Sequence, residues 1–328
     1  MRLTLDEVED LARDALRRAG ASEGQAGPVA RSLRRAEAEG IRSHGLLYLP
    51  VYAGHLRCGK VQGQAVPQVA QPRPGAVAVD AGHGFAHPAI AAGLPLLVQA
   101  ARECGIAAMT LRRSYNCGVL GHHAADLAAQ GLIGLCFTHA PASIAPPGGR
   151  VPVIGTNPFA LAVPGAPGEA GFVLDQSASV VAKSEILLRA RRGEPIPEGW
   201  ALDGEGRPTT DPAQALKGSM LPAGGAKGFG AGLLAEVLAS ALSGAVASRE
   251  ASPFSGPEGG PPGTGQCFIA LDPAAFAPGF AARIGALCAA VEGQEGARLP
   301  GSRRRAARAA TADGVEVPED LLRQIQEN

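Results

Sequence analysis

A serine and a histidine stand side by side where a helical pattern ends, in Ser43-His44-Gly45. An imidazole exchanges protons near neutral pH, and a neighbouring hydroxyl can hold its ring in one orientation. We therefore expect His44 to act as a proton donor or acceptor, with Ser43 as its orienting partner. The competing interpretation is a histidine that caps the end of the preceding helix.

Three further sites have the residue types of an anion-binding surface. His122 follows Gly121 at the start of a predicted helix, where free amides and the helix dipole favour a phosphate. Lys227 lies in the glycine-rich run 224–228 and is a candidate contact for phosphate or carboxylate. The alternative for both is a solvated surface position. Asp175 ends a strand, and we expect it either to face a pocket or to cap a turn.

Several other chemistries find no support in the sequence. The His, Cys, Asp and Glu residues show no zinc-binding spacing, and neither a G-x-S-x-G nucleophile turn nor a P-loop is present. We therefore expect no metal. The G-x-G-x-x-G dinucleotide fingerprint is also missing, so a bound dinucleotide would need another geometry.

The composition of the chain limits the binding partners and the cellular location that we expect. The chain has 30 basic and 30 acidic residues and only 4% aromatic residues, so we expect no nucleic-acid partner. The N-terminus has acidic residues in place of a signal-peptide pattern, and the apolar stretch 230–247 is interrupted by Glu236, which favours a buried helix over a membrane span. Six cysteines without a C-x-x-C pair favour a reducing, cytoplasmic setting.

The elements that must position these residues alternate between strand and helix, which predicts an α/β fold. Thr4 and Glu7 form a capping box, and apolar residues then recur at helical spacing, so the first ~60 residues are predicted to be mostly helical. The stretch 118–158 combines a helix, a buried strand and a Pro- and Gly-rich loop. We expect it to form the mouth of a nucleotide and substrate pocket.

The other segments are expected as connectors, helices and loops. They are a Pro- and Gln-rich connector at 64–74, helices at 178–192, 229–244 and 274–292, a surface excursion at 193–217, a loop at 251–265, and a basic patch, Arg303 to Arg305, before a final short helix. Lys183 and the basic patch are candidates to hold a cofactor 2′-phosphate.

A series of motifs runs along nearly the whole chain in one order. They are SHG (43–45), GxxGHH (118–123), APPGG (145–149), GTNPFALAVP (155–164), ARRGEPIPEGWALDGEGRPTTDP (190–212), LPAGGAKG (221–228), GQCFIALDP (265–273) and LPG (299–301). Together they resemble the malate/L-lactate dehydrogenase family of nicotinamide-dependent oxidoreductases, which is distinct from the Rossmann lactate dehydrogenases. That family includes sulfolactate and ureidoglycolate dehydrogenases, diketogulonate reductase and Δ1-piperideine-2-carboxylate reductases.

The resemblance implies an α/β, sulfolactate dehydrogenase-like fold whose cofactor-binding sheet is not of Rossmann type. Residues 1–75 would form a helical segment that carries the catalytic histidine, 76–285 the cofactor-binding domain, and 286–328 a helical segment that packs with the first. The resemblance also implies a homodimer that binds NAD or NADP and a small-molecule carboxylate substrate, with no nucleic-acid or membrane partner.

Roles for single residues follow from the same resemblance and from the patterns above. His44 is expected to give or take the proton, oriented by Ser43. Substrate contacts are expected from Tyr48, Asn116 and Thr156. Cofactor contacts are expected from His122, Thr138, Gly155, Asp175, Lys183, Gly225, Lys227, Gly228 and Arg303.

Two positions depart from the family pattern. Members often carry an arginine four residues after the SHG histidine, where it clamps the substrate carboxylate, and this chain has Tyr48 there. A phenol donates one hydrogen bond and cannot form the bidentate charged pair. The family's second histidine, in SNHFG or SHHFG, falls on Asn116, which cannot shuttle protons. Both changes indicate a substrate other than plain malate.

We therefore expect an NAD(P)-dependent oxidoreductase that transfers a hydride to or from C2 of a small 2-hydroxy or 2-oxo acid of malate, lactate or sulfolactate type, with a slight preference for NADPH. The alternative within the family is NAD(P)H-dependent reduction of cyclic 2-imino acids, Δ1-piperideine-2-carboxylate or Δ1-pyrroline-2-carboxylate, because an iminium needs less acid assistance than a ketone. An alternative of another class is a non-catalytic nucleotide-binding protein.

Overall fold

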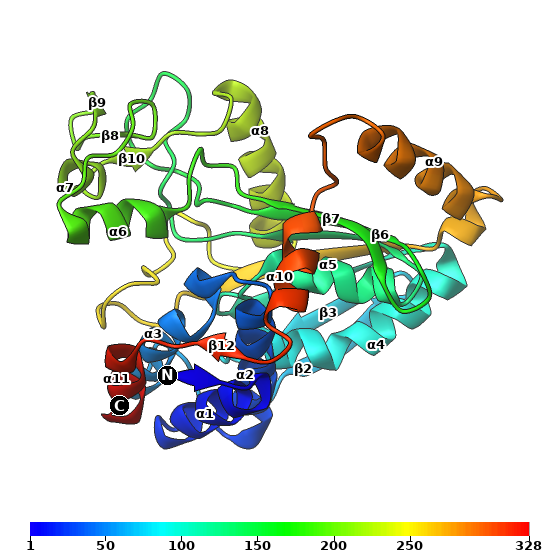
Figure 1. The fold of residues 1–328 in the computed structure, drawn as a ribbon, viewed down its shortest axis with the longest axis horizontal. Helices are drawn as coiled ribbons and strands as arrows, with labels where there is room; N and C mark the ends of the chain where they lie inside the picture. Colours follow the sequence, from blue (N-terminus) through cyan, green and yellow to red (C-terminus); the bar gives the residue numbers. More distant parts are fainter. Residues whose placement is uncertain (328) are drawn as a thin grey trace.

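The computed structural model describes residues 1–327, and a seven-stranded sheet forms its centre (Figure 1). The strands, in their spatial order, are β2 (Gln68–Arg73), β3 (Ala76–Asp80), β4 (Ile106–Ser114), β11 (Thr264–Leu271), β5 (Ile133–Thr138), β6 (Phe159–Pro164) and β7 (Ala170–Gln176). Within the described residues the one parallel pair is β3 with β4, and the other neighbours run antiparallel. The expected α/β class is confirmed.

Helices cover both faces of this sheet. α4 (Ala86–Cys104) and α5 (Leu120–Ala129) pack on one face, where Val79, Met109 and Leu127 are buried in a shared core. On the other face, α8 (Ala226–Ala235) continues into a π-helical turn, Glu236–Ala241, which packs against β5 and β11. The sheet is thus a rigid layer whose strand and helix ends can hold side chains for chemistry.

The two ends of the chain form one helical body beside the sheet. It contains α1 (Leu5–Arg18), α2 (Glu23–Ala38), 3₁₀ turns at Arg42–His44 and Leu46–Tyr48, α3 (Leu49–Arg57) and, from the C-terminus, α11 (Glu319–Glu327). β1 (Arg2–Leu3) pairs with β12 (Val315–Glu316), and the blue and dark red ends of the chain accordingly lie side by side in Figure 1. Leu322 and Ile325 are buried with Leu16 and Leu33 in one core.

The expected capping box is confirmed. Thr4 N donates to Glu7 Oε2 at 2.7 Å, and Glu7 N donates back to Thr4 Oγ1 at 3.2 Å. These two bonds satisfy amides that an uncapped helix would leave without partners.

A smaller lobe lies at the upper left of Figure 1. It holds α6 (Lys183–Arg192), β8 (Ala201–Leu202), β9 (Pro208–Thr209), α7 (Pro212–Ala215) and β10 (Ser219–Met220). The excursion expected at 193–217 therefore includes strands of a three-stranded sheet and a short helix. After β11 the chain forms a 3₁₀ turn, Pro273–Ala275, then α9 (Phe280–Glu292) and α10 (Ser302–Ala310). The domain boundary expected at 286 falls inside α9, and the expected domain division stays a prediction.

Several expected boundaries are wrong for local reasons. The connector at 64–74 contains the edge strand β2, where Pro72 is tolerated because an edge strand need not donate on its outer side. The helix expected from 178 starts at Lys183, because Ser179 first bridges to Pro222 in extended form. The helix expected from 274 starts at Phe280, after Gly279 with a φ of 75°.

Two further boundaries differ in the same way. The helix expected at 229–244 begins earlier, at Ala226, and its C-terminal half is the π-helical turn. The basic patch 303–305 lies within α10, a helix that was not expected, and it precedes the final short helix α11 as expected. In residues 1–327 no helix has the length and apolarity to cross a bilayer.

The Gly155-Thr156-Asn157 turn is locked to the elements around it. A Cβ at Gly155 would lie 2.2 Å from the Ala140 carbonyl oxygen. Asn157 is fully buried with a φ of 37°; its Oδ1 accepts from Ala140 N at 3.2 Å, and its Nδ2 donates to Glu236 Oε2 at 2.8 Å. The turn therefore has one available conformation.

We predict that Gly155→Ala destabilises the protein by more than about 2 kcal/mol, because the clashing atom is backbone and cannot move aside alone. Gly54→Ala in α3 is the matched control, since nothing lies within 4 Å of its Cβ position. That control should be neutral or stabilising by about 0.5–1 kcal/mol. Urea denaturation measures both, and equal midpoints for Gly155→Ala and the unmodified chain would contradict this account.

Candidate active site

Ser43 and His44 form the pair that their spacing suggested. Both lie in the 3₁₀ turn after α2, and Ser43 Oγ is 3.0 Å from His44 Nδ1. This contact uses one ring nitrogen and leaves Nε2 for a ligand. Solvent reaches the His44 side chain, yet the protein around it is dense enough that burial lowers its pKa below the ordinary value. The imidazole thus lies in a recess that opens outward.

Asp175 and Arg304 lie next to this recess. Asp175 ends β7, and its Oδ2 accepts from Arg304 Nη2 at 2.8 Å and from the Gly121 amide at 3.0 Å. Besides burial, the Asp175 charge raises the pKa of His44 and the Arg304 charge lowers it. The ion pair therefore lies close enough to His44 to act on its protonation.

Gly121 makes this arrangement possible at the start of α5. A Cβ there would lie 2.8 Å from both Asp175 Oδ2 and Arg304 Nη1. Only a residue without a side chain lets the carboxylate reach the helix N-terminus, where the dipole favours negative charge. This amide binds the protein's own aspartate.

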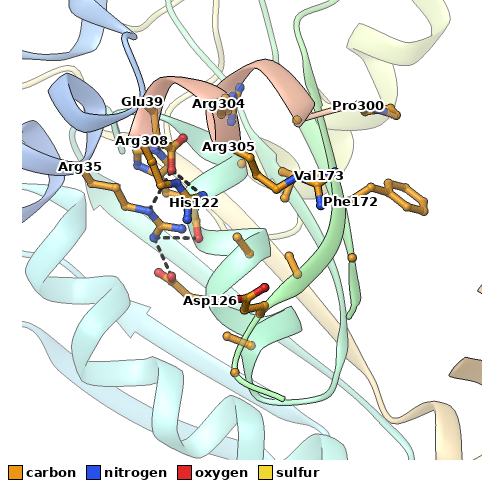
Figure 2. A pocket seen from close by; sticks show the side chains of 18 residues that line it. Arg35, Glu39, His122, Asp126, Phe172, Val173, Pro300, Arg304, Arg305 and Arg308 are labelled. Carbon is orange, nitrogen blue, oxygen red and sulfur yellow. Dashed lines mark hydrogen bonds and ion pairs between the residues drawn. The ribbon is translucent and has the colours of Figure 1, made fainter. Parts of the chain in front are cut away.

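A pocket of about 320 Å³ lies between α5, β7 and α10, and Arg304 is one of its lining residues (Figure 2). Its cationic lining consists of four arginines, namely Arg35, Arg304, Arg305 and Arg308. Three acidic residues, Glu39, Asp126 and Glu169, also line it. Its volume is in the range of small-molecule sites, and its net charge favours an anion.

The arginines of this pocket differ in how firmly they are paired. Arg35 Nη1 lies 2.6 Å from Asp126, and Arg308 Nη2 lies 2.9 Å from Glu39. Figure 2 shows these four residues around the pocket. Arg305 has only a distant contact, 3.9 Å to Glu292, and it is about half exposed. Arg305 is therefore the arginine most available to a phosphate, since a long exposed ion pair contributes little.

His122 lines this pocket, but its charge state differs from what an anion site needs. Its Nε2 donates to Glu39 Oε2 at 3.0 Å, and burial lowers its pKa to about 4. The ring is neutral at pH 7, and the cofactor contact expected at His122 stays a prediction. Its buried Nδ1 has no hydrogen-bond partner among residues 1–327 and remains available to a ligand.

Arg303 and Arg304 of the basic patch differ in their exposure. Arg303 is exposed, whereas Arg304, the next residue of α10, turns inward to Asp175. On a helix, residues four apart share a face, so Arg304 and Arg308 line the pocket together. The cofactor contact expected at Arg303 stays a prediction, and its neighbours Arg304, Arg305 and Arg308 are the arginines of α10 that line the pocket.

A second group of expected residues meets at the small lobe. Ala178 N donates to Thr156 O and Ala223 N donates to Ala178 O, each at 2.8 Å. These bonds join the GTNP turn to the 223–228 turn, where a Cβ at Gly228 would lie 2.0 Å from the Ala223 carbonyl oxygen. Ala178 is three positions after Asp175 in the chain, a span of at most about 10 Å. The GTNP turn and the 223–228 turn therefore lie near Asp175.

The remaining expected cofactor residues lie differently. Gly225 and Lys227 are exposed at the start of α8, and Lys183 is exposed at the start of α6, although nearby protein lowers its pKa by burial. Thr138 is buried, and its hydroxyl accepts from Gln266 Nε2 at 3.2 Å within the sheet. The cofactor roles expected for these residues stay predictions.

Tyr48 and Asn116 belong to an aromatic cluster beside the His44 turn. The Tyr48 ring packs edge-on against Tyr52 at 4.8 Å, and the Tyr52 hydroxyl donates to Asn116 Oδ1 at 2.7 Å. Burial raises the pKa of Tyr48 to about 12, so its phenol stays protonated. Tyr115, Phe85 and Phe254 complete the cluster.

Sequence reasoning did not single out Arg35, Glu39 or Arg308, and it named Arg304 only as one member of the basic patch. The available signal was spacing, because Arg35 with Glu39 and Arg304 with Arg308 are four residues apart. The spacing of Arg304 and Arg308 indicates a shared face only if a helix starts near Ser302, and that helix was not expected from the sequence. Among residues 1–327, no three His, Cys, Asp or Glu side chains gather as a metal site.

Comparisons with known proteins agree with this geometry. The family model described as malate/L-lactate dehydrogenase matches residues 3–326. The (2R)-3-sulfolactate dehydrogenase (NADP(+)) of Chromohalobacter salexigens is 44% identical over 99% of this chain and 97% of its own. The Delta(1)-pyrroline-2-carboxylate reductase of Ancylobacter novellus is 42% identical over 99% and 97%.

Solved structures give the same result. The Δ1-piperideine-2-carboxylate reductase from Pseudomonas syringae pvar. tomato has a TM-score of 0.93 at 35% identity and covers 100% of this chain and 99% of its own. The sulfolactate dehydrogenase from Methanocaldococcus jannaschii has a TM-score of 0.89 at 30% identity, with coverage of 100% and 96%.

These matches confirm the expected fold and the expected NAD(P)-dependent oxidoreductase, and they do not support a non-catalytic nucleotide-binding protein. The recess at His44, the arginine-lined pocket and a match over almost every residue lead to one assignment. The chain belongs to the malate/L-lactate dehydrogenase family.

Proposed function

We propose that the enzyme transfers a hydride between a nicotinamide cofactor and C2 of a small 2-hydroxy or 2-oxo acid. The observation that carries the proposal is the Ser43–His44 pair beside the Asp175–Arg304 ion pair, whose arginine also lines the pocket. The named activity of the sulfolactate dehydrogenase relative supports this substrate class.

The pocket fits the phosphate groups of NAD(P). Arg305 is loosely paired, His122 Nδ1 is an orphaned buried atom, and the backbone of Gly301 turns with a φ of 85° at the pocket rim. In our proposal Arg305 and Arg308 hold the phosphates, and Asp175 lies near the nicotinamide end. When bound, the nicotinamide supplies or accepts the hydride.

The protein supplies the proton and the orientation. His44 Nε2 gives a proton to the substrate C2 oxygen during reduction and removes it during oxidation, while Ser43 holds Nδ1. Thr156, from the GTNP turn, and Tyr48 are proposed to contact the substrate. Arg304 and Asp175 set the charge around the imidazole, so they influence the pH at which it is protonated.

A second candidate, reduction of cyclic 2-imino acids, is favoured by the aromatic cluster. Tyr48 stands at the position where the family resemblance implies a carboxylate-binding arginine, and its ring joins Tyr52 and Tyr115 in an edge-to-face group. An apolar wall with one phenol donor suits a saturated ring better than a second acidic group. The pyrroline- and piperideine-carboxylate reductases among the relatives support this candidate. Rates with NADPH against 2-oxo acids and cyclic imino acids in parallel decide between the two.

The assembly we propose is a homodimer. α8 and the turn after it expose Leu233, Leu234, Val237 and Leu242, each between 43% and 59%. A run of large apolar side chains on one helix is typical of a surface covered by a partner. A second copy is the partner that the resemblance implies.

A reducing, cytoplasmic setting is our proposal for the location. All six cysteines are free, and Cys117, Cys136 and Cys267 are buried. Burial raises the pKa of Cys117 and Cys267 to about 12, which keeps these thiols protonated and unreactive.

We predict that His44→Ala lowers kcat roughly 10²–10⁴-fold, the usual contribution of a general acid. NADPH affinity, followed by fluorescence titration, should change little because the imidazole does not hold the phosphates. A variant with wild-type turnover would remove His44 from the mechanism.

The pH dependence of the reaction should follow the charges beside His44. Reduction needs protonated His44, so kcat/KM for reduction should fall as pH rises through the His44 pKa, which burial holds below the ordinary histidine value. Asp175→Asn removes a charge that raises this pKa and should move the profile to lower pH, whereas Arg304→Gln should move it to higher pH. Identical midpoints in all three proteins would contradict the assignment.

Cofactor preference should depend on Arg305. Arg305→Gln is expected to raise KM for NADPH about 10–100-fold, the effect of losing a charged hydrogen bond of about 1.5–3 kcal/mol, with a smaller effect on NADH. Arg303→Gln on the same helix is the matched control, since Arg303 is exposed. A larger effect at Arg303 than at Arg305 would contradict the proposal that Arg305 contacts the cofactor.

A further inference from the structure

Glu37 occupies a position that stability alone does not favour. It lies in the last turn of α2, where the helix dipole disfavours a carboxylate, and it is only 5% exposed. Burial is the main influence on this carboxyl and raises its pKa. A costly buried acid at a helix end calls for a compensating role.

The carboxylate reaches across to the turn that carries His44. Glu37 Oε1 accepts a hydrogen bond from Leu46 N at 2.7 Å, in a buried environment. Leu46 is two residues after His44 and begins the second 3₁₀ turn. The bond thus joins the end of α2 to the junction between the two turns.

Gly45 is the residue that makes room for this bond. A Cβ at Gly45 would lie 2.1 Å from Glu37 Oε1 and 2.7 Å from its carboxyl carbon. The carboxylate therefore fills the space that any other side chain would occupy. This contact gives a physical reason for the glycine in the Ser43-His44-Gly45 motif.

We propose that Glu37 is a positioning residue for His44, acting by fixing the Gly45–Leu46 backbone. The inference rests on the proposed function, because it assumes that His44 carries the proton. Main-chain bonds from His44 N to Ile41 O at 2.9 Å and from Gly45 N to Arg42 O at 3.1 Å close the first turn. The Glu37 bond then sets the direction in which that turn leaves α2, and with it the direction of the imidazole.

The test compares Glu37→Met with Glu37→Gln. Met has a similar length but accepts no hydrogen bond of comparable strength, so kcat should fall about 10–100-fold, as for a misplacement on the order of 1 Å. NADPH affinity and the KM of the acid substrate should stay close to wild type. Gln keeps an acceptor for Leu46 N and should restore most of kcat. Glu103→Met, at an exposed site on α4, controls for the substitution itself.

Gly45→Ala provides an independent arm if Glu37→Met folds poorly. The new Cβ should displace the carboxylate, so Gly45→Ala alone should lower kcat as Glu37→Met does. Combining Gly45→Ala with Glu37→Ala removes the clash, and the loss should be much smaller than the sum of the two single effects. Additive losses would overturn the proposal.

The outcomes separate this inference from the function beneath it. If the wild-type protein reduces no acid or imine with NADPH, the proposed function fails. If the wild type is active and Glu37→Met matches its kcat at temperatures where both are folded, the positioning role is wrong. A kcat loss that Gln does not repair, accompanied by an equal loss of NADPH affinity, would show a structural role only.

Discussion

The ion pair between Asp175 and Arg304 is the constraint on which the rest of the site depends. It joins the end of the edge strand β7, the N-terminus of α5 and α10, three elements far apart in the chain. The pair acts on the charge of the His44 imidazole, and its arginine also lines the pocket. Without the pair, two partly buried groups would be left as unpaired charges, which is unfavourable.

This arrangement explains how a dinucleotide site can exist without a G-x-G-x-x-G loop. In a Rossmann fold the helix N-terminus receives the pyrophosphate. Here the α5 N-terminus is already bound to Asp175, and cationic side chains from α10 and α2 line the neighbouring pocket. Positive charge for an anion thus comes from arginine side chains in place of a free helix end.

The sequence was most informative where one residue type has one use. Ser43-His44-Gly45 predicted an oriented imidazole, and the Thr4–Glu7 pattern predicted the helix cap; the structure has both contacts. Alternating strands and helices predicted the α/β class, which the mixed sheet confirms. Short-range spacing carried all of this information.

Other features depend on long-range contacts that no local pattern reveals. The cofactor contact expected at His122 stays a prediction, but the hydrogen bond of its Nε2 to Glu39, more than 80 residues earlier, has no local signal. The basic patch 303–305 was a candidate for a phosphate, but the sequence did not show which arginine faces inward. The start of α10 at Ser302 was not recognised, and one residue turns a side chain by about 100° on a helix. The strand β2 was missed because Pro72 argues against a strand anywhere except at an edge.

The most direct test of the central claim is a crystal structure with NADPH and a non-reacting 2-hydroxy acid bound together. We predict His44 Nε2 within about 2.6–3.2 Å of the C2 oxygen. We also predict the nicotinamide C4 about 3–3.5 Å from C2, on the side of Asp175. A nicotinamide bound away from the Asp175–Arg304 pair, or an imidazole separated from the substrate by more than one water molecule, would contradict the account.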